Sequence, residues 1–331
     1  MNIMKSPVTG KEMQVRNEVT SLVFRKEEFE VVTHYYECKD SGERFSDDRL
    51  DELSIVQVHN QYREKYGIPF PDEIRRIREG YGVSASKMSE ILGLGANSYR
   101  LYEAGEVPSV AIGRLIMSIR NPATFIQQVT ASAHFLSDKE IKKLTEAVET
   151  RNTQFITEKI FPSKLNGYRQ PDFAKIAGII AFFQVLRKIT LFKTKLNKLL
   201  FYADFNAYQL TGYSITGLEY RAIQFGPVPS HFQKMYVNLS EQGQISIDEQ
   251  YFGNGAYGDE INTNTTFDQT LFSQEELKVL EFVAKRYGKL STDDIVKLSH
   301  EETAWCDNAE QKALINYRYA FELNEGIGYN S

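Results

Sequence analysis

The amino-acid sequence predicts an α+β protein that is mainly α-helical. We expect a small β-hairpin subdomain at the amino end, then a helix-turn-helix domain, then a helical domain with a small β-sheet. Two runs of β-branched and aromatic residues, 20–24 and 29–37, predict the hairpin. Helical apolar spacing around a short glycine-bearing turn predicts a helix-turn-helix within 71–105. After residue 173, apolar helical segments alternate with short strand-like ones, which predicts the last part.

Composition indicates a soluble, cytoplasmic protein. The chain has 331 residues, 42% of them hydrophobic, and a formal net charge of -5. Its two cysteines, Cys38 and Cys306, exclude a disulfide framework or a complete cysteine metal site. The amino end lacks an apolar signal core and no segment is long enough to span a bilayer, so we expect no membrane contact. The expected parts are a hairpin subdomain with its connecting helix (1–66), a helix-turn-helix domain (67–135), a linker helix (136–165) and a final domain (166–331).

The first part carries the spacing of a zinc knuckle without its thiols. The strands 20–24 and 29–37 should pair through a polar turn at Arg25 to Glu28, and a helix should follow with Ser46 or Asp47 as its N-cap. "SPVT" (Ser6 to Thr9) and "CKDS" (Cys38 to Ser41) are spaced like two C-x-x-C pairs. Only Cys38 is a thiol, and hydroxyls are poor zinc ligands. We therefore predict a metal-free subdomain and no cofactor.

The second part has the pattern of a DNA-binding helix pair. Ser84 is a natural N-cap, and Met88, Ile91 and Leu92 should face inward before the turn "LGLG". Residues 61–120 carry 9 Lys and Arg against 7 Asp and Glu, whereas 166–331 carry 16 against 20, so the positive charge lies where DNA contact is expected. Asparagine can pair with adenine and arginine with guanine. The alternative is a helical pair used only for packing. The candidate DNA-binding residues are Asn97, Ser98, Arg100, Lys87, Ser86 and Tyr99.

These features resemble a known family. "LVFRK", the C-x-x-S after the second strand and above all "GLGANSYRLYEAGE" make residues 1 to about 130 resemble the MqsA/YgiT-type antitoxins. The resemblance implies a dimer that represses its own operon, with Asn97 at the base-reading position. Leu101 stands where the family has a second base-reading arginine, and Arg100 lies one place earlier. One residue turns a side chain by roughly 100° on a helix, so Arg100 could reach a phosphate instead.

The third part is predicted to be helical with strand-like insertions. "SDKE" opens the linker helix as a capping box, and the boxes "SQEE" and "STDD" begin two later helices. Residues 194–212 form a buried-helix candidate with one apolar stripe that ends at Gly212. Residues 220–232 read as a strand that runs into a Gly-Pro turn, and residues 240–261 have strand and turn chemistry.

The sequence offers little for an enzyme. His231, His300 and the acids Asp204, Glu301 and Glu302 are present, but no second histidine lies at metal-ligand spacing from His300. Cys306 beside Trp305 is expected to be a buried, inert thiol. A glycine-rich phosphate loop and a nucleophile elbow are both missing from the sequence. We therefore predict no catalytic activity.

Three segments in order, "KLNKLLFYADFNAYQLTG", "YRAIQFGPVPSHF" and "LSHEETAW", make residues 166 to about 323 resemble the Panacea domain of SocA/GepA-like antitoxins. The resemblance implies a protein-binding domain that neutralises a partner toxin. We therefore expect a homodimeric antitoxin that binds a cognate protein toxin and double-stranded operator DNA. Alternatives are a stand-alone regulator whose last domain senses a small molecule, and an adaptor that delivers a toxin to a protease. The candidate toxin-binding residues are Phe225, Pro227, His231 and Phe232.

Overall fold

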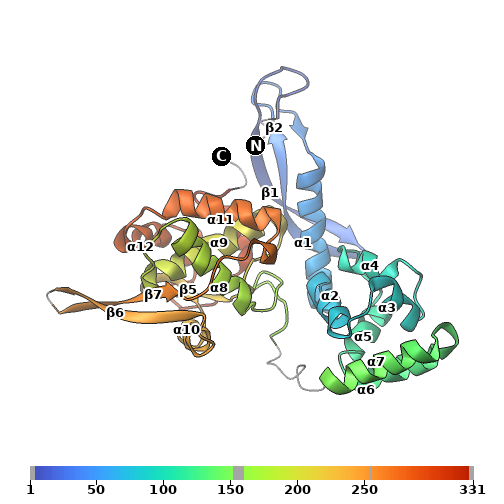
Figure 1. The fold of residues 1–331 in the computed structure, drawn as a ribbon. Coiled ribbons are helices and arrows are strands. Elements are labelled where there is room, and N and C mark those ends of the chain that lie inside the picture. Colours follow the sequence, from blue (N-terminus) through green and yellow to red (C-terminus); the bar gives the residue numbers. More distant parts are fainter. Residues whose placement is uncertain (1–3, 152–159, 254, 328–331) are drawn as a thin grey trace. The chain divides into compact units, whose positions relative to one another are not determined.

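The computed structural model describes residues 4–151, 160–253 and 255–327 (Figure 1). It confirms the mainly helical α+β class: an amino-terminal sheet, a helical middle and carboxy-terminal helices with two small sheets. The chain divides into two compact units, one made of residues 1–57 with 161–331 and one of residues 58–160. The division falls within helix α1 (Asp48–Tyr66). The four-part organisation expected from the sequence stays a prediction.

The predicted hairpin is present. Strand β1 (Gln14–Phe24) pairs antiparallel with β2 (Glu27–Glu37), and the short β3 (Arg44–Phe45) adds to β2. The turn is tighter than expected, because only Arg25 and Lys26 connect the strands. Both have positive φ, 48° and 70°, as a two-residue hairpin turn requires.

The start of α1 lies against this sheet. Asp47 is the N-cap, since the Leu50 amide donates to its Oδ1 at 2.9 Å. The Gln57 side chain bonds to both backbone groups of Val32, accepting at 3.0 Å and donating at 2.9 Å. A buried amide that satisfies both groups of a strand residue replaces the missing neighbour strand at that point.

The amino-terminal sheet also packs on the last helical turn of its unit, Tyr317–Glu322. The rings of His34 and Phe321 are 5.1 Å apart, and Asn17 Nδ2 donates to the Phe321 carbonyl at 3.4 Å. Arg318 forms an ion pair with Glu30. Segments about 300 residues apart in the sequence thus share one compact unit.

Helix α9 (Lys193–Thr211) is the centre of the carboxy-terminal part, and α11, α12 and β5 all pack on it. It ends at Gly212, with φ 75°, as predicted. The helix is buried, as predicted, but on every side rather than along one apolar stripe, and its polar residues are buried too. The other elements are α8 (Phe173–Ala181), a π-helical turn (Phe182–Leu186), β4 (Tyr220–Ile223), β5 (Gly226–Pro229), α10 (Phe232–Glu241), β6 (Ile245–Gly253), β7 (Ala256–Thr263), α11 (Gln274–Tyr287), α12 (Thr292–His300) and α13 (Thr303–Cys306).

Local capping signals are confirmed in this part. Ser273 Oγ accepts from the Glu276 amide at 3.2 Å and Glu276 returns a bond to the Ser273 amide at 2.9 Å, which completes a capping box on α11. Ser291 caps α12. The Gly-Pro turn was misplaced, because Gly226 already begins β5.

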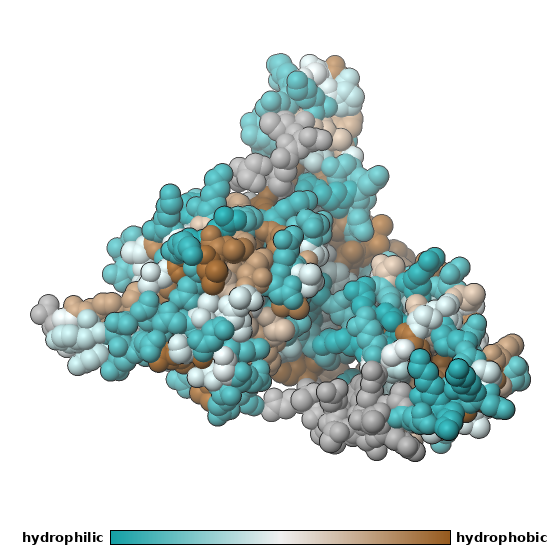
Figure 2. All heavy atoms as spheres, viewed as in Figure 1, coloured by the Kyte–Doolittle hydropathy of each residue, from teal (hydrophilic) through white to brown (hydrophobic). Residues whose placement is uncertain are grey.

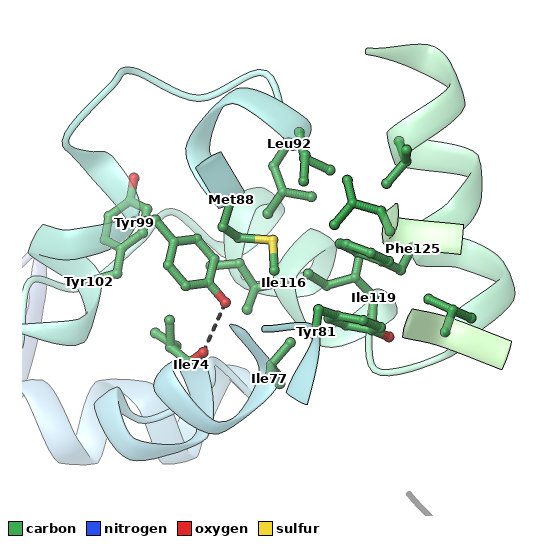
Figure 3. Close-up of a cluster of buried hydrophobic side chains, with 14 of the residues drawn as sticks. Ile74, Ile77, Tyr81, Met88, Leu92, Tyr99, Tyr102, Ile116, Ile119 and Phe125 are labelled. Carbon is green, nitrogen blue, oxygen red and sulfur yellow. Dashed lines mark hydrogen bonds between the residues drawn. The ribbon is translucent and has the colours of Figure 1, made fainter. Parts of the chain in front are cut away.

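The unit of residues 58–160 is a small helical bundle around one apolar core (Figure 3). In that core Tyr81 stacks on Phe125 with ring centroids 3.7 Å apart, and the Tyr99 hydroxyl donates to the Ile74 carbonyl at 2.9 Å. Ser137 and Glu140 form the predicted capping box of the last helix, whose expected continuation to Phe155 lies outside the described residues. The helices are α2 (Pro71–Gly80), α3 (Ala85–Ile91), α4 (Ser98–Glu103), α5 (Val110–Ser118), α6 (Pro122–Ala131) and α7 (Asp138–Arg151).

Candidate functional site

The structure brings the four corners of the knuckle pattern together. Thr9 Oγ1 and Cys38 Sγ lie 3.3 Å apart, and hydroxyls from Ser41, Thr9 and Ser6 bond to the same sulfur. These hydrogen bonds lower the pKa of Cys38 to about 6, because they stabilise the thiolate. The amides of Val8 and Thr9 both donate to Ser6 Oγ at 3.2 Å. Hydrogen bonds thus tie these turns together. Among the described residues no group of three or more His, Cys, Asp or Glu could hold a metal ion.

This geometry gives a prediction about zinc. Wild-type protein should keep its melting temperature when metal is chelated, because one thiol cannot hold zinc alone. The triple variant Ser6→Cys, Thr9→Cys and Ser41→Cys should bind one zinc ion per chain and melt higher with zinc than after chelation. Metal analysis and thermal melts measure both. Stoichiometric zinc in the wild type, lost together with its structure, would contradict the first expectation.

The candidate DNA-binding residues surround the turn between α3 and α4. Asn97 and Arg100 are exposed, Ser98 is half-buried, and Ser86 is exposed on α3. Lys87 is committed to two carboxylates, Glu90 at 2.6 Å and Glu140 at 3.1 Å. It is therefore less available to a phosphate than the sequence suggested. Helix α4 is also shorter than expected, since it ends at Glu103.

Tyr99 is a correction to the candidate set. Its side chain is fully buried in the core of Figure 3, its hydroxyl bonds to Ile74, and its amide donates to Ser89 Oγ at 3.1 Å. A side chain that fills the core cannot also reach a base. Tyr99 positions α4 on α2 instead. Arg78 of α2 supports the same arrangement through its ion pair with Glu103, at 2.5 Å.

A buried carboxylate organises the centre of the carboxy-terminal part. Asp204 on α9 accepts the amides of Ile215 and Thr216, each at 2.8 Å, the Tyr220 hydroxyl at 2.8 Å, and the Thr216 hydroxyl. Burial raises the pKa of Asp204, although the hydrogen bonds from Thr216, Tyr220 and Ile215 act in the opposite direction. These four bonds hold the loop before β4, and β4 itself, on α9.

A lysine is buried beneath the β4–β5 turn. Lys198 is fully buried on α9, and its ammonium nitrogen donates to the Pro227 carbonyl at 2.9 Å. Gly226 leaves room for it: a Cβ at this position would lie 2.8 Å from Lys198 Cε and even closer to Ser299 Oγ. Gly226 and Pro227, at the start of β5, therefore pack closely on the lysine. Burial lowers the pKa of Lys198 to about 7.

The lowered pKa of Lys198 predicts how the free energy of unfolding changes with pH. Between about pH 7 and the usual lysine pKa near 10.4, the unfolded chain binds a proton that the folded protein does not. Stability should therefore rise with pH in this window and be independent of this group below pH 7. Relative to Lys198→Met, the free energy of unfolding of the wild type should increase by about 1.4 kcal/mol per pH unit above pH 7. Urea titrations at several pH values measure it, with the exposed Lys297→Met as control. A constant difference would contradict the assignment.

The candidate toxin-binding residues differ in how exposed they are. Phe225 is 59% exposed at the tip of the β4–β5 turn, and His231 is exposed, but Phe232 is half-buried. Pro227 is buried against Lys198, so it is unavailable to a partner and is withdrawn from the set. The ring of Phe225 is the one large apolar group that this turn presents.

The residues considered for catalysis differ in burial and in their contacts. His300 stacks on Trp305 at 4.1 Å, and burial together with the nearby Lys198 lowers the pKa of His300. Glu302 is buried and accepts from the Tyr202 hydroxyl at 3.2 Å. Cys306 is exposed, so the expectation of a buried thiol was wrong. Its thiol bonds to the His300 carbonyl at 3.3 Å.

Sequence reasoning missed an aromatic cluster on the β6–β7 hairpin. Tyr251, Phe252 and Tyr257 are all exposed. The available signal was "QYFGNGAYG", which sets aromatic residues on both sides of a glycine-rich turn. Within the described parts of the chain, no helix has the length and apolar character that a membrane span needs.

Comparison with known proteins supports one of the two resemblances. Residues 196–306, from α9 to α13, match the family described as "Antitoxin SocA-like, Panacea domain". No curated protein and no solved structure matches the chain. No comparison supports the resemblance of the first 130 residues to the MqsA/YgiT-type antitoxins. The matched range contains Asp204, Lys198, the β4–β5 turn and the β6–β7 hairpin. The chain therefore contains a SocA-like Panacea domain at residues 196–306.

Proposed function

We propose that this protein is the antitoxin of a toxin–antitoxin pair and neutralises its toxin by direct binding through the Panacea domain. The observation that carries the proposal is the family match over residues 196–306. The domain around α9 is well packed, and its conspicuous polar groups, Asp204 and Lys198, are committed to internal bonds. A domain of this kind offers a partner its surface, and the proposal assigns it no catalytic step.

The test uses the product of the reading frame next to the gene. Expressed alone, this product should arrest growth, and co-expression of the full chain should restore it. The purified proteins should form a complex. The proposal is wrong if the full chain does not relieve the growth arrest and the purified proteins form no complex in solution. Rescue that needs a particular protease would identify an adaptor instead.

We further propose that the unit of residues 58–160 binds operator DNA as a dimer and represses the operon. Helix α3, the turn 92–97 and α4 have the order of a helix-turn-helix, with the Ser84 cap and the inward set Met88, Ile91 and Leu92 expected for one. Asn97 and Arg100 are exposed at the amino end of α4, where base edges are read in such folds. A twofold dimer would match a palindromic operator.

The DNA proposal predicts separable effects. Asn97→Ala should weaken operator binding by about 1–3 kcal/mol and relax specificity at one base pair. Arg100→Ala, if this side chain meets a phosphate, should weaken binding to all sequences and flatten its salt dependence by about one unit of slope. The exposed Gln127→Ala on α6 is the matched control. Operator affinity unchanged in the double variant of Asn97 and Arg100 would show that another surface binds DNA.

A further inference from the structure

An arm with exposed aromatic side chains extends from the Panacea domain. Strands β6 and β7 form a hairpin whose closed end projects beyond the helices of its own domain (Figure 1). Near this end Tyr251, Phe252 and Tyr257 are 61%, 58% and 61% exposed. In Figure 2 the arm shows pale and tan atoms on the surface of the molecule. Grouped aromatic side chains of this kind mark binding surfaces on soluble proteins.

The aromatic groups are arranged by the backbone. Tyr251 and Tyr257 form a cross-strand pair with ring centroids 5.0 Å apart. A register shift between Tyr251 and Gly253 makes Phe252 a bulge residue, and a bulge re-aims its side chain. The Phe252 ring lies over Gly258, where a Cβ would come within 2.8 Å of it, and reaches the Phe192 ring at 5.1 Å. Both the bulge and Gly258 thus set the direction of Phe252.

The aromatic cluster borders a cleft. Its aromatic lining residues are Phe252, Tyr257 and Phe192, its charged ones are Asp259, Asp293 and Lys193, and its volume is about 520 Å³. This is room for one or two side chains of a partner. Binding hot spots commonly combine exposed aromatic anchors with such a pocket.

The charge of the arm defines the partner. In the hairpin register Glu249 faces Asp259 on the face that carries Tyr251 and Tyr257, and Asp248 faces Glu260 on the opposite face. Like charges placed opposite each other destabilise a sheet. Asp259 is paired with Lys193 at 2.6 Å, and Asp248 accepts from the Asn262 amide group at 2.9 Å. Over the residues that the structure describes, neither Glu249 nor Glu260 has a cation within ion-pair distance. A basic partner would relieve this repulsion.

We propose that the β6–β7 arm is the surface on which this antitoxin binds its toxin, through a basic segment whose apolar side chain enters the cleft. The inference rests on the proposed function and adds the site and the chemistry of the partner. A second copy of the chain would bring carboxylates against carboxylates. Nucleic acid and anionic lipid carry the same sign of charge and would also be repelled.

The test compares full-length variants in binding to the purified product of the adjacent reading frame. The triple variant Tyr251→Ala, Phe252→Ala and Tyr257→Ala should bind at least about 30-fold more weakly than the wild type, because one hot-spot side chain already contributes about that factor. Glu249→Lys, on the hairpin face that carries Tyr251 and Tyr257, should weaken binding about tenfold or more and reduce its salt dependence. Both variants should leave operator binding unchanged. The matched control is Val237→Ala, an exposed apolar residue on α10. Phe225→Ala tests the competing site at the β4–β5 turn, where the exposed ring is a candidate toxin contact.

The possible results distinguish failure of the proposed arm site from failure of the proposed antitoxin function. If the wild type neither binds nor neutralises the probe, the proposed function fails and the inference fails with it. If the wild type binds and both arm variants bind within about threefold of it, the inference alone is wrong. Loss of binding in Phe225→Ala with full binding in the arm variants would assign the toxin to the β4–β5 turn. Unchanged thermal melts show that the variants fold, and the charge variant is informative even if the aromatic one aggregates.

Discussion

Asp204→Ala is expected to lower the free energy of unfolding by about 3–5 kcal/mol, because it leaves several buried hydrogen-bond donors without an acceptor. The carboxylate receives four hydrogen bonds, from two amides and two hydroxyls, in a site with no exposed surface. Alanine removes the acceptor, and burial keeps water from replacing it. The loop that carries Ile215 and Thr216 then loses its attachment to α9.

Denaturant titration measures this effect, and two variants calibrate it. Asp204→Asn keeps the volume and one acceptor oxygen, so its loss should be smaller than that of alanine. Asp307→Ala removes an exposed carboxylate with a single bond to the Tyr319 hydroxyl and should change stability by about 0.5 kcal/mol or less. A midpoint for Asp204→Ala equal to that of Asp307→Ala would show that the network adds nothing to stability.

The local signals in the sequence predicted local structure well. Ser273, Ser291 and Ser137 announce helices because a cap depends on residues three positions apart. The same holds for Gly212 at the end of α9, where only the backbone conformation of one residue matters. The hairpin of β1 and β2 follows from two β-rich runs around a polar turn.

The errors concern side chains whose environment is built by distant segments. Tyr99 sits on the amino end of α4 beside Asn97, but α2 covers it. Lys198 is a charged residue on a predicted helix, and only the approach of β5 encloses it. Cys306 next to Trp305 suggested burial, yet the tryptophan turns to the Ile223 carbonyl and leaves the thiol outside. No spacing rule reports such tertiary contacts.

The same distinction between local signals and tertiary contacts applies to the candidate sites. Ser6, Thr9, Cys38 and Ser41, which have the spacing of a zinc knuckle in the sequence, come together in the structure because two short turns carry them. The aromatic arm was missed because an aromatic residue in a strand is usually core. Whether Tyr251 and Tyr257 face the interior or water depends on how far the hairpin extends past its domain, which only the fold shows.

Gly217→Ala should lower the free energy of unfolding by roughly 2–5 kcal/mol, more than any other glycine substitution in the Panacea domain. Gly217 has φ 72°, which is unfavourable for alanine, and a Cβ there would lie 2.8 Å from Pro171 N and closer still to the Gln170 carbonyl. These are backbone atoms, so a rotamer change cannot relieve the clash. The Asp172 amide bonds to the Thr216 carbonyl at 2.9 Å, which holds the two loops at this separation.

The matched control is Gly243→Ala, which isolates the backbone effect. Gly243 has nearly the same φ, 69°, but nothing lies within 4 Å of a Cβ built there. The free energy of unfolding of this variant should fall by only about 1–2 kcal/mol, the usual cost of a left-handed conformation in a residue with a side chain. Denaturant midpoints of the two variants give the difference, which is the energy of the contact with residues 170–171. If both variants lose the same free energy, the loops separate without cost, and the segment before α8 does not hold the Asp204 loop in place.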